Sequence, residues 1–135
     1  MKPNPNDEAK RWLLQAQHVL DVATKLLKSA DYAESCFHAE QVGQLALKAF
    51  LYAQGERFVP IHSLRELLEQ AVRYDATFRQ CEDAAKILDQ YYIPTRYPDA
   101  LAFPGVPYKT YTQGQAEDAV RLAQRILDLV KQHVR

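Results

Sequence analysis

The sequence is dominated by long stretches in which apolar residues recur every three or four positions, uninterrupted by glycine or proline. Such spacing lines the apolar side chains along one face of an α-helix. The clearest stripes run from Leu13 to Leu27 and from Ala116 to Val130. Hydrophobic residues make up 47% of the chain and charged residues 25%, the proportions of an ordinary globular protein. Because no segment alternates like a β-strand, the spacing predicts an all-α domain.

The segment from Asp31 to Gly55 is apolar over more than one stripe, which predicts a central helix buried on two sides. Only a short joint separates it from the first helix, so the two are expected to run antiparallel. Ser63 and Thr112, each followed three residues later by Glu or Gln, are typical starts of two further helices. We therefore expect an antiparallel up-and-down four-helix bundle with a short extra helix, in a single domain of residues 1–135.

Two segments fall outside the helical pattern. Residues 1–6 are polar and contain two prolines, and we expect a flexible N-terminus that is not a secretory signal. Residues 93–111 contain four prolines, one glycine and three tyrosines, and we expect a loop that lies against the bundle. No apolar run is long enough to cross a membrane, which predicts a cytoplasmic protein.

The 17 Lys and Arg residues balance the 17 Asp and Glu residues. A net charge near zero argues against a protein whose whole surface grips nucleic acid, but it leaves room for a local basic site. Cys36 and Cys81 fall within helical patterns and form no CxxC pair, so we expect buried free thiols. The four His and two Cys show no metal-ligand spacing, and we expect neither a metal nor a cofactor.

Three segments carry a resemblance to a known family. They are the central helix DYAESCFHAEQVGQLALKAFLYAQGE, the loop–helix junction IHSLRELL and the stretch LDQYYIPTRYPD. Together with the helix start YTQGQA, they resemble the HEPN family, in particular the minimal HEPN proteins found beside small nucleotidyltransferases in bacteria and archaea. The resemblance spans about Asp7 to Val130, nearly the whole chain.

The resemblance implies a homodimer of helical bundles that handles ligands near the protomer interface. It also implies a function linked to nucleotides or RNA, with an MNT-type nucleotidyltransferase as partner. Several HEPN proteins are RNA-cutting toxins that such a partner holds in check, in toxin–antitoxin pairs. Other HEPN proteins are catalytically silent binding modules.

RNA-cutting relatives place an Arg and a His late in the bundle with four to six residues between them, the Arg for phosphate charge and the His for proton transfer. No histidine follows Arg96 within this spacing, so the late motif is absent. Arg11 and His18 match the spacing, but on one helix they would lie roughly 10 Å apart along the axis. Arg57 and His62 flank a loop and could converge as a catalytic pair. Alternatively, His62 caps or packs at the helix entry.

Arg96, Tyr97 and Asp99 form the constellation that we favour as a phosphate site. An Arg fork suits phosphate bidentately, Tyr offers a stacking face, and Asp can orient the Arg or accept from a ribose hydroxyl. The alternative is structural: Pro94 and Pro98 stiffen a turn in which Arg96 pairs with Asp99. In that alternative Tyr97 plugs the core.

On the central helix, His38, Gln41 and Lys48 are spaced by three and seven residues and share one face. A buried polar stripe must find partners or water. One interpretation is a polar pocket that faces Arg96 and that Lys109 could close. The other is a solvated face with His38 partly packed.

Three hypotheses follow for the function. The first is a homodimeric binding module that acts with a nucleotidyltransferase and engages a nucleotide or RNA phosphate through Arg96. The second is a metal-independent RNase that uses Arg57 and His62. The third is a purely structural dimerisation bundle, in which Arg96 contributes only to stability.

Overall fold

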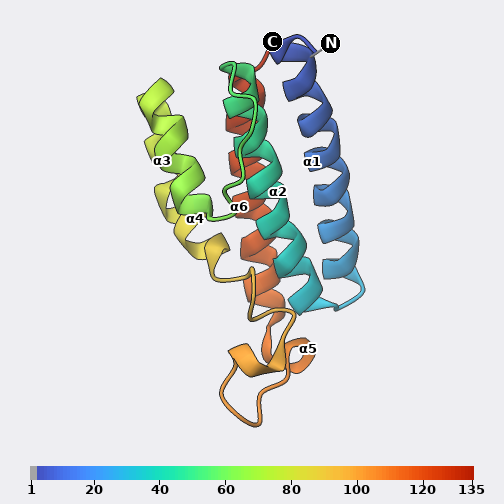
Figure 1. Cartoon of the computed structure of the whole chain (residues 1–135). Coiled ribbons are helices and arrows are strands. Elements are labelled where there is room, and N and C mark those ends of the chain that lie inside the picture. Colours follow the sequence, from blue (N-terminus) through green and yellow to red (C-terminus); the bar gives the residue numbers. More distant parts are fainter. Residues whose placement is uncertain (1–2) are drawn as a thin grey trace.

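The long helices of the molecule run side by side (Figure 1). The computed structural model describes residues 3–135, and its long helices are α1 (Pro5–Lys28), α2 (Tyr32–Ala53) and α6 (Gln113–His133). α2 packs against both of the others and is mostly buried, as expected of a central helix. None of residues 3–135 forms a strand, and the predicted all-α bundle is confirmed.

The turn between α1 and α2 is tight because one residue adopts a left-handed backbone. Ala30 has a φ of 65°, and the amide of Asp31 donates to the carbonyl oxygen of Leu26 at 2.9 Å. This pattern closes the end of α1 and reverses the chain. The Asp31 carboxylate accepts from the Ser29 hydroxyl at 2.6 Å and makes no capping bond to α2.

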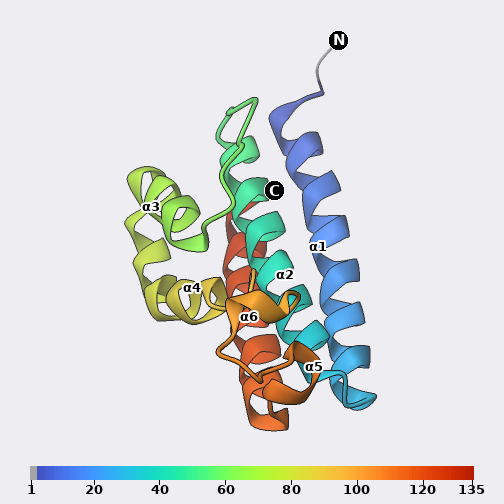
Figure 2. The same cartoon turned by 60° about the horizontal axis from the view of Figure 1, so that its bottom comes forward.

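Two short helices complete the bundle beside α2 and α6. α3 (Leu64–Tyr74) begins after Ser63, whose hydroxyl accepts from the Glu66 amide as predicted. A 3₁₀ turn, η1 (Ala76–Cys81), then leads into α4 (Glu82–Asp89). Figure 2 shows α3 and α4 on the side of the bundle away from α1.

Residues 93–111 lie at the end of the bundle where α2 begins (Figure 1). They are only partly irregular, because they contain the 3₁₀ turn η2 (Pro98–Ala100) and the one-turn helix α5 (Pro107–Thr110). Thr95 near the start of the segment and the first residue of α5 are buried, whereas Phe103 between them is 98% exposed. The loop thus lies against the bundle at its base and projects at its tip.

α1 begins earlier than the sequence indicated. Asn4 caps it by accepting from the amide of Asn6 at 2.8 Å. Pro5 occupies the first turn, where its missing N–H has no partner to lose. The predicted flexible segment of residues 1–6 is therefore helical in its last part, and residues 1–2 lie outside the described residues.

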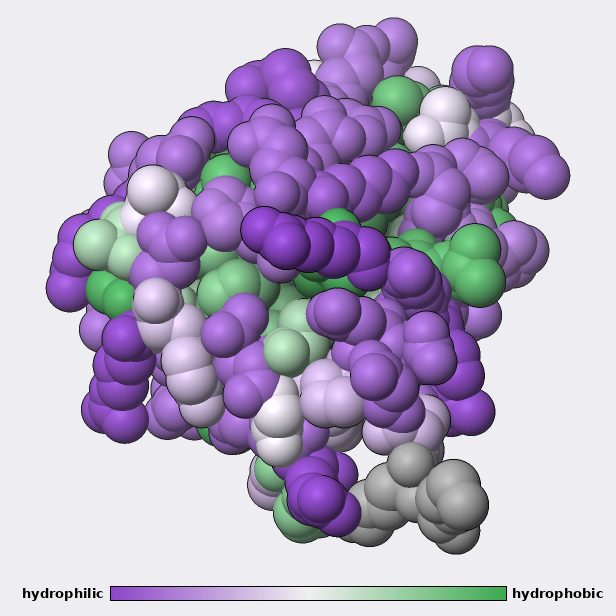
Figure 3. All heavy atoms as spheres, turned by 90° about the horizontal axis from the view of Figure 1, so that it is seen from above, coloured by the Kyte–Doolittle hydropathy of each residue, from purple (hydrophilic) through white to green (hydrophobic). Residues whose placement is uncertain are grey.

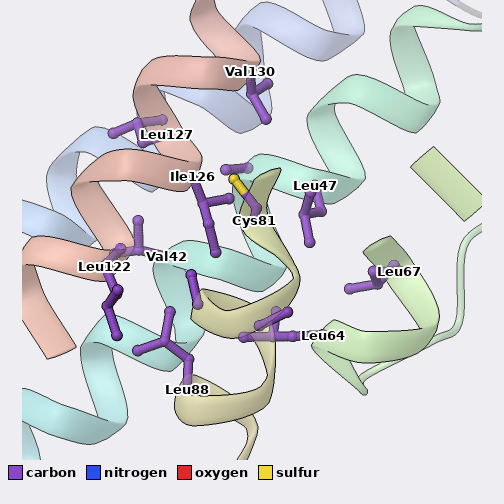
Figure 4. Close-up of a cluster of buried hydrophobic side chains, with 14 of the residues drawn as sticks. Val42, Leu47, Leu64, Leu67, Cys81, Leu88, Leu122, Ile126, Leu127 and Val130 are labelled. Atoms are coloured by element: carbon purple, nitrogen blue, oxygen red, sulfur yellow. The ribbon is translucent and has the colours of Figure 1, made fainter. Parts of the chain in front are cut away.

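One hydrophobic core links the helices. In Figure 4, side chains of α2, α3, α4 and α6 meet in it. Gly43 lets α3 approach α2 closely, because a Cβ at this position would lie 3.0 Å from a methyl carbon of Leu64. Cys36 and Cys81 are buried and free, as predicted.

Within residues 3–135, no helix combines the length and apolar character needed to cross a membrane. Seen from the end where α1 begins and α6 ends, most of the surface is hydrophilic, with small hydrophobic areas between polar side chains (Figure 3). Exposed apolar side chains include Leu14 on α1 and Phe58 in the loop after α2, and several others lie within residues 93–111.

Candidate functional site

Arg96 lies among three aromatic rings. Its Cζ atom is 4.4 Å from the ring centroid of Phe37, 4.8 Å from that of Tyr92 and 5.1 Å from that of Tyr97. Its Nε donates to the carbonyl oxygen of Tyr92 at 2.9 Å. Aromatic faces attract cations electrostatically, so the guanidinium is held against α2 although the side chain is exposed. We call these four residues the Arg96 site.

The sequence suggested that Asp99 could orient Arg96, but the structure shows no ion pair between the two residues. Asp99 is exposed on η2, and among the described residues no Asp or Glu forms an ion pair with Arg96. Tyr97 is 49% exposed and lies beside the guanidinium rather than in the core. The structural alternative, a turn closed by an Arg96–Asp99 pair over a buried Tyr97, does not describe this segment.

His62 joins the same group of rings. Its ring lies 6.1 Å from that of Tyr92 at an interplanar angle of 19°, and its Nδ1 is 3.4 Å from Oε1 of Gln44. Tyr92 therefore contacts both His62 and Arg96, which are 34 positions apart in the numbering of the chain. No spacing rule in the sequence predicts this pairing.

Arg57 and His62 do not share one hollow. Arg57 lines a hollow of about 370 Å³ near the start of α1, together with Pro5, Glu8 and Tyr52. His62 lines a different one, beside Tyr92. The two residues that the sequence suggested as a catalytic pair are thus placed at separate positions.

The hollow beside Tyr92 measures about 430 Å³ and is lined mainly by apolar surface. His62, Ser63, Tyr92, Ile93 and Pro94 contribute to it. It adjoins the Arg96 site, because Tyr92 belongs to both. Among residues 3–135, no three His, Cys, Asp or Glu side chains gather closely enough to hold a metal ion.

A buried polar stripe on α2 extends beyond the residues that sequence reasoning selected. Glu40 is fully buried, and its carboxylate oxygens accept from Nε2 of Gln41 and of Gln44, at 2.7 Å each. Burial raises the pKa of Glu40 to about 7 against the opposing effect of these hydrogen bonds. The step of four between Glu40, Gln44 and Lys48, in an otherwise apolar helix, was the signal that could have identified the stripe.

His38 borders the Arg96 site without reaching Arg96. It is half-buried, and its Nδ1 lies 2.9 Å from the carbonyl oxygen of Glu34. Its ring meets that of Phe37 edge-on at 5.4 Å. His38 thus packs at the side of the site, which matches the interpretation of a partly packed histidine.

Lys48 and Lys109 are not among the four residues of the Arg96 site. Lys48 comes eleven residues after Phe37 on α2, about 16 Å further along the helix axis. It is buried, and burial lowers its pKa, so the predicted solvated face is not what α2 presents there. Lys109 is exposed on α5, where its Nζ lies 5.5 Å from the ring centroid of Tyr108.

The molecule is thus an α-helical bundle that holds one arginine between aromatic rings beside its central helix. Among solved structures, TT1696 from Thermus thermophilus is similar, with a TM-score of 0.86 and 42% sequence identity. That similarity covers 93% of this chain and 97% of the other. ST0689, an archaeal HEPN homologue, has a TM-score of 0.77 and 32% identity over the full length of both chains.

A curated protein of Methanocaldococcus jannaschii, named "Putative toxin MJ1304", is 27% identical over an alignment of 136 positions. The alignment covers 91% of this chain and 86% of that protein. The sequence model of the HEPN domain matches residues 9–133. The chain therefore belongs to the HEPN family, as the resemblance of its central helix and its YIPTRYPD segment indicated.

Proposed function

We propose that this chain is the HEPN half of a toxin–antitoxin-like pair, in which it forms a homodimer and recognises the phosphate of a nucleotide or RNA through Arg96. Its partner in this proposal is a minimal nucleotidyltransferase. The relative from Methanocaldococcus jannaschii carries the word toxin in its name, which supports the toxin-like part of the proposal. The family membership supports a module of the kind found in such pairs.

The observation that carries the proposal is the fixed guanidinium of Arg96. Three rings and one carbonyl oxygen hold it, so little side-chain freedom remains to be lost when a ligand binds. Its planar fork offers paired N–H donors that match phosphate oxygens. No carboxylate of the described residues neutralises its charge by an ion pair. Tyr97, half exposed beside it, offers a face on which a base can stack.

RNA cleavage by Arg57 and His62 is the weaker proposal, because these residues line different hollows. It predicts that the purified protein cleaves RNA in the presence of EDTA and that a His62→Ala variant does not. Cleavage by both proteins, or by neither, contradicts this assignment of the pair.

The phosphate proposal is tested by titrating the purified protein with adenosine 5′-monophosphate and following amide signals by NMR. Arg96→Ala should weaken binding by at least about tenfold, the loss expected for a charge-assisted hydrogen bond. Arg121→Ala is the matched control, because Arg121 is an exposed arginine on α6 that pairs with Asp118 at 2.9 Å. Equal affinity of Arg96→Ala and the unchanged protein, or no binding by either, contradicts the proposal.

The assembly part of the proposal needs separate measurements. Light scattering should give the mass of two chains. Co-expression with a nucleotidyltransferase encoded beside this gene should yield a complex that co-purifies. A single-chain mass contradicts the homodimer, and failure to co-purify contradicts the partner.

A further inference from the structure

A chain of hydrogen bonds leads from the buried Glu40 to the exposed His62. Oε2 of Glu40 accepts from Nε2 of Gln44 at 2.7 Å, and Oε1 of Gln44 faces Nδ1 of His62 at 3.4 Å. Glu40 is fully buried and Gln44 is 6% exposed. The chain thus connects the interior of α2 to the edge of the Arg96 site.

The chemistry of the groups sets the direction of each hydrogen bond. An ionised carboxylate only accepts, so the Gln44 amide must turn its NH₂ group toward Glu40 and its oxygen away. An amide oxygen also only accepts, so the Nδ1 atom of His62 that faces it must carry a hydrogen. In a neutral imidazole the other nitrogen, Nε2, then has a free lone pair.

Two further contacts fix where the imidazole lies. Its ring stacks on Tyr92 at an interplanar angle of 19°. The next residue, Ser63, donates its hydroxyl to the Asp89 carboxylate at 3.2 Å, which ties this part of the loop to α4. The ring plane and the backbone of His62 are therefore held from two sides.

We propose that Glu40 is a positioning residue that acts through Gln44 to hold His62 as the Nδ1–H tautomer, so that Nε2 accepts a hydrogen bond from a ligand hydroxyl. The ligand part of this inference rests on the proposed phosphate site. Arg96 supplies donors for a phosphate and His62 supplies an acceptor for a hydroxyl, around the same Tyr92 ring. That combination selects a ribonucleotide, which carries both groups, over an analogue that lacks the ribose hydroxyls.

The tautomer is read directly from the ¹⁵N chemical shifts of the histidine ring nitrogens at pH 8. The Glu40 carboxyl, whose pKa burial raises to about 7, is mostly ionised at that pH. The unchanged protein should show the His62 signals of an Nδ1–H ring, assigned by their absence in a His62→Gln variant. Glu40→Gln should shift these signals toward a mixture of tautomers, because a Gln side chain can both donate to and accept from Gln44.

Gln41→Met is the matched control. Gln41 donates the other hydrogen bond to Glu40 at 2.7 Å, and its side chain does not lie between Glu40 and His62. It should leave the His62 tautomer unchanged. If Glu40→Gln fails to fold, Gln44→Met removes the acceptor itself and should cause the same shift. An Nε2–H ring in the unchanged protein, or signals that neither variant moves, overturns the inference.

The ligand part is tested with adenosine 5′-monophosphate and its 2′,3′-dideoxy analogue. The unchanged protein should bind the first about fivefold more tightly, the value of one net hydrogen bond, and Glu40→Gln should lose this preference. Equal binding of both nucleotides to the unchanged protein overturns the hydroxyl role of His62 and leaves the phosphate site standing. No binding of either, with the tautomer result intact, contradicts the proposed function and supports the positioning role.

Discussion

The carboxylate of Asp89, at the end of α4, holds the start of α3 by accepting from the backbone amide of Leu64 at 2.6 Å. It also accepts from the amide of Arg65 at 3.1 Å. The first amides of a helix lack partners within the helix, and here a side chain 25 residues away in the sequence provides them. This contact ties α3 to α4 and fixes the residues that follow His62.

Asp89→Ala should therefore destabilise the protein by about 1–2 kcal/mol, the usual effect of losing a helix cap. Urea unfolding followed by circular dichroism measures this change. Asp99→Ala is the comparison, because Asp99 is exposed on η2 and caps no helix in this way. Similar unfolding midpoints for the two variants would argue that Asp89 does not stabilise α3.

Gly43→Ala should destabilise the protein by about 1–3 kcal/mol, as an added methyl group does in a well-packed core. The new Cβ would lie 3.0 and 3.1 Å from the two methyl carbons of Leu64, so the Leu64 side chain would have to shift within the packed core. Thermal unfolding measures the loss. In a protein that already carries Leu64→Ala, the change Gly43→Ala should reduce the stability much less than it does in the unchanged protein. An equal loss of stability in both proteins contradicts the packing argument.

Ala30→Gly should stabilise the protein by about 0.5–1 kcal/mol, because glycine adopts a left-handed backbone without the steric cost of a Cβ. Ala30 has such a backbone, with a φ of 65°. Lys28→Gly, within the last turn of α1, should act in the opposite direction because glycine disfavours an ordinary helical position. Chemical unfolding of both variants tests this, and destabilisation by Ala30→Gly contradicts it.

The stability of the protein should fall as pH rises between about 5 and 8, in part because of Glu40. Burial raises the pKa of Glu40 from its ordinary value of 4.5 to about 7, so in this range the folded state binds more protons than the unfolded state. Glu40→Gln should remove a part of this fall, on the order of 3 kcal/mol. Urea unfolding at several pH values across this range measures it.

Glu117→Gln, an exposed change on α6, serves as the control for that series. Its stability should follow the pH dependence of the unchanged protein. If Glu40→Gln and Glu117→Gln give parallel curves, the buried carboxyl does not contribute to the pH dependence.

The helices were predictable because each depends on residues that are neighbours in the sequence. The stripe between Leu13 and Leu27 identifies α1, and the pair of Thr112 and Gln115 identifies the start of α6, where both bonds of the capping box are present. The early start of α1 was less clear, because Asn4 acts through a local hydrogen bond that several residues nearby could also make.

The surroundings of Arg96 were not predictable in the same way. The sequence selected Arg96 and Tyr97, but it offered no reason to bring Phe37 of α2 to the same guanidinium. The spacing in the sequence also suggested that His62 pairs with Arg57, five positions earlier. The fold instead brings His62 to Tyr92. Such contacts depend on how α2, α4 and the loop after α4 pack together, and no local pattern records that packing.

The way in which residues 93–111 are attached has a practical consequence. Thr95 and Pro107 are buried at the two ends of the projecting part, while Phe103 between them is almost fully exposed. Since nothing in the core depends on the tip, a fluorophore or an affinity tag can be joined there with little effect on folding.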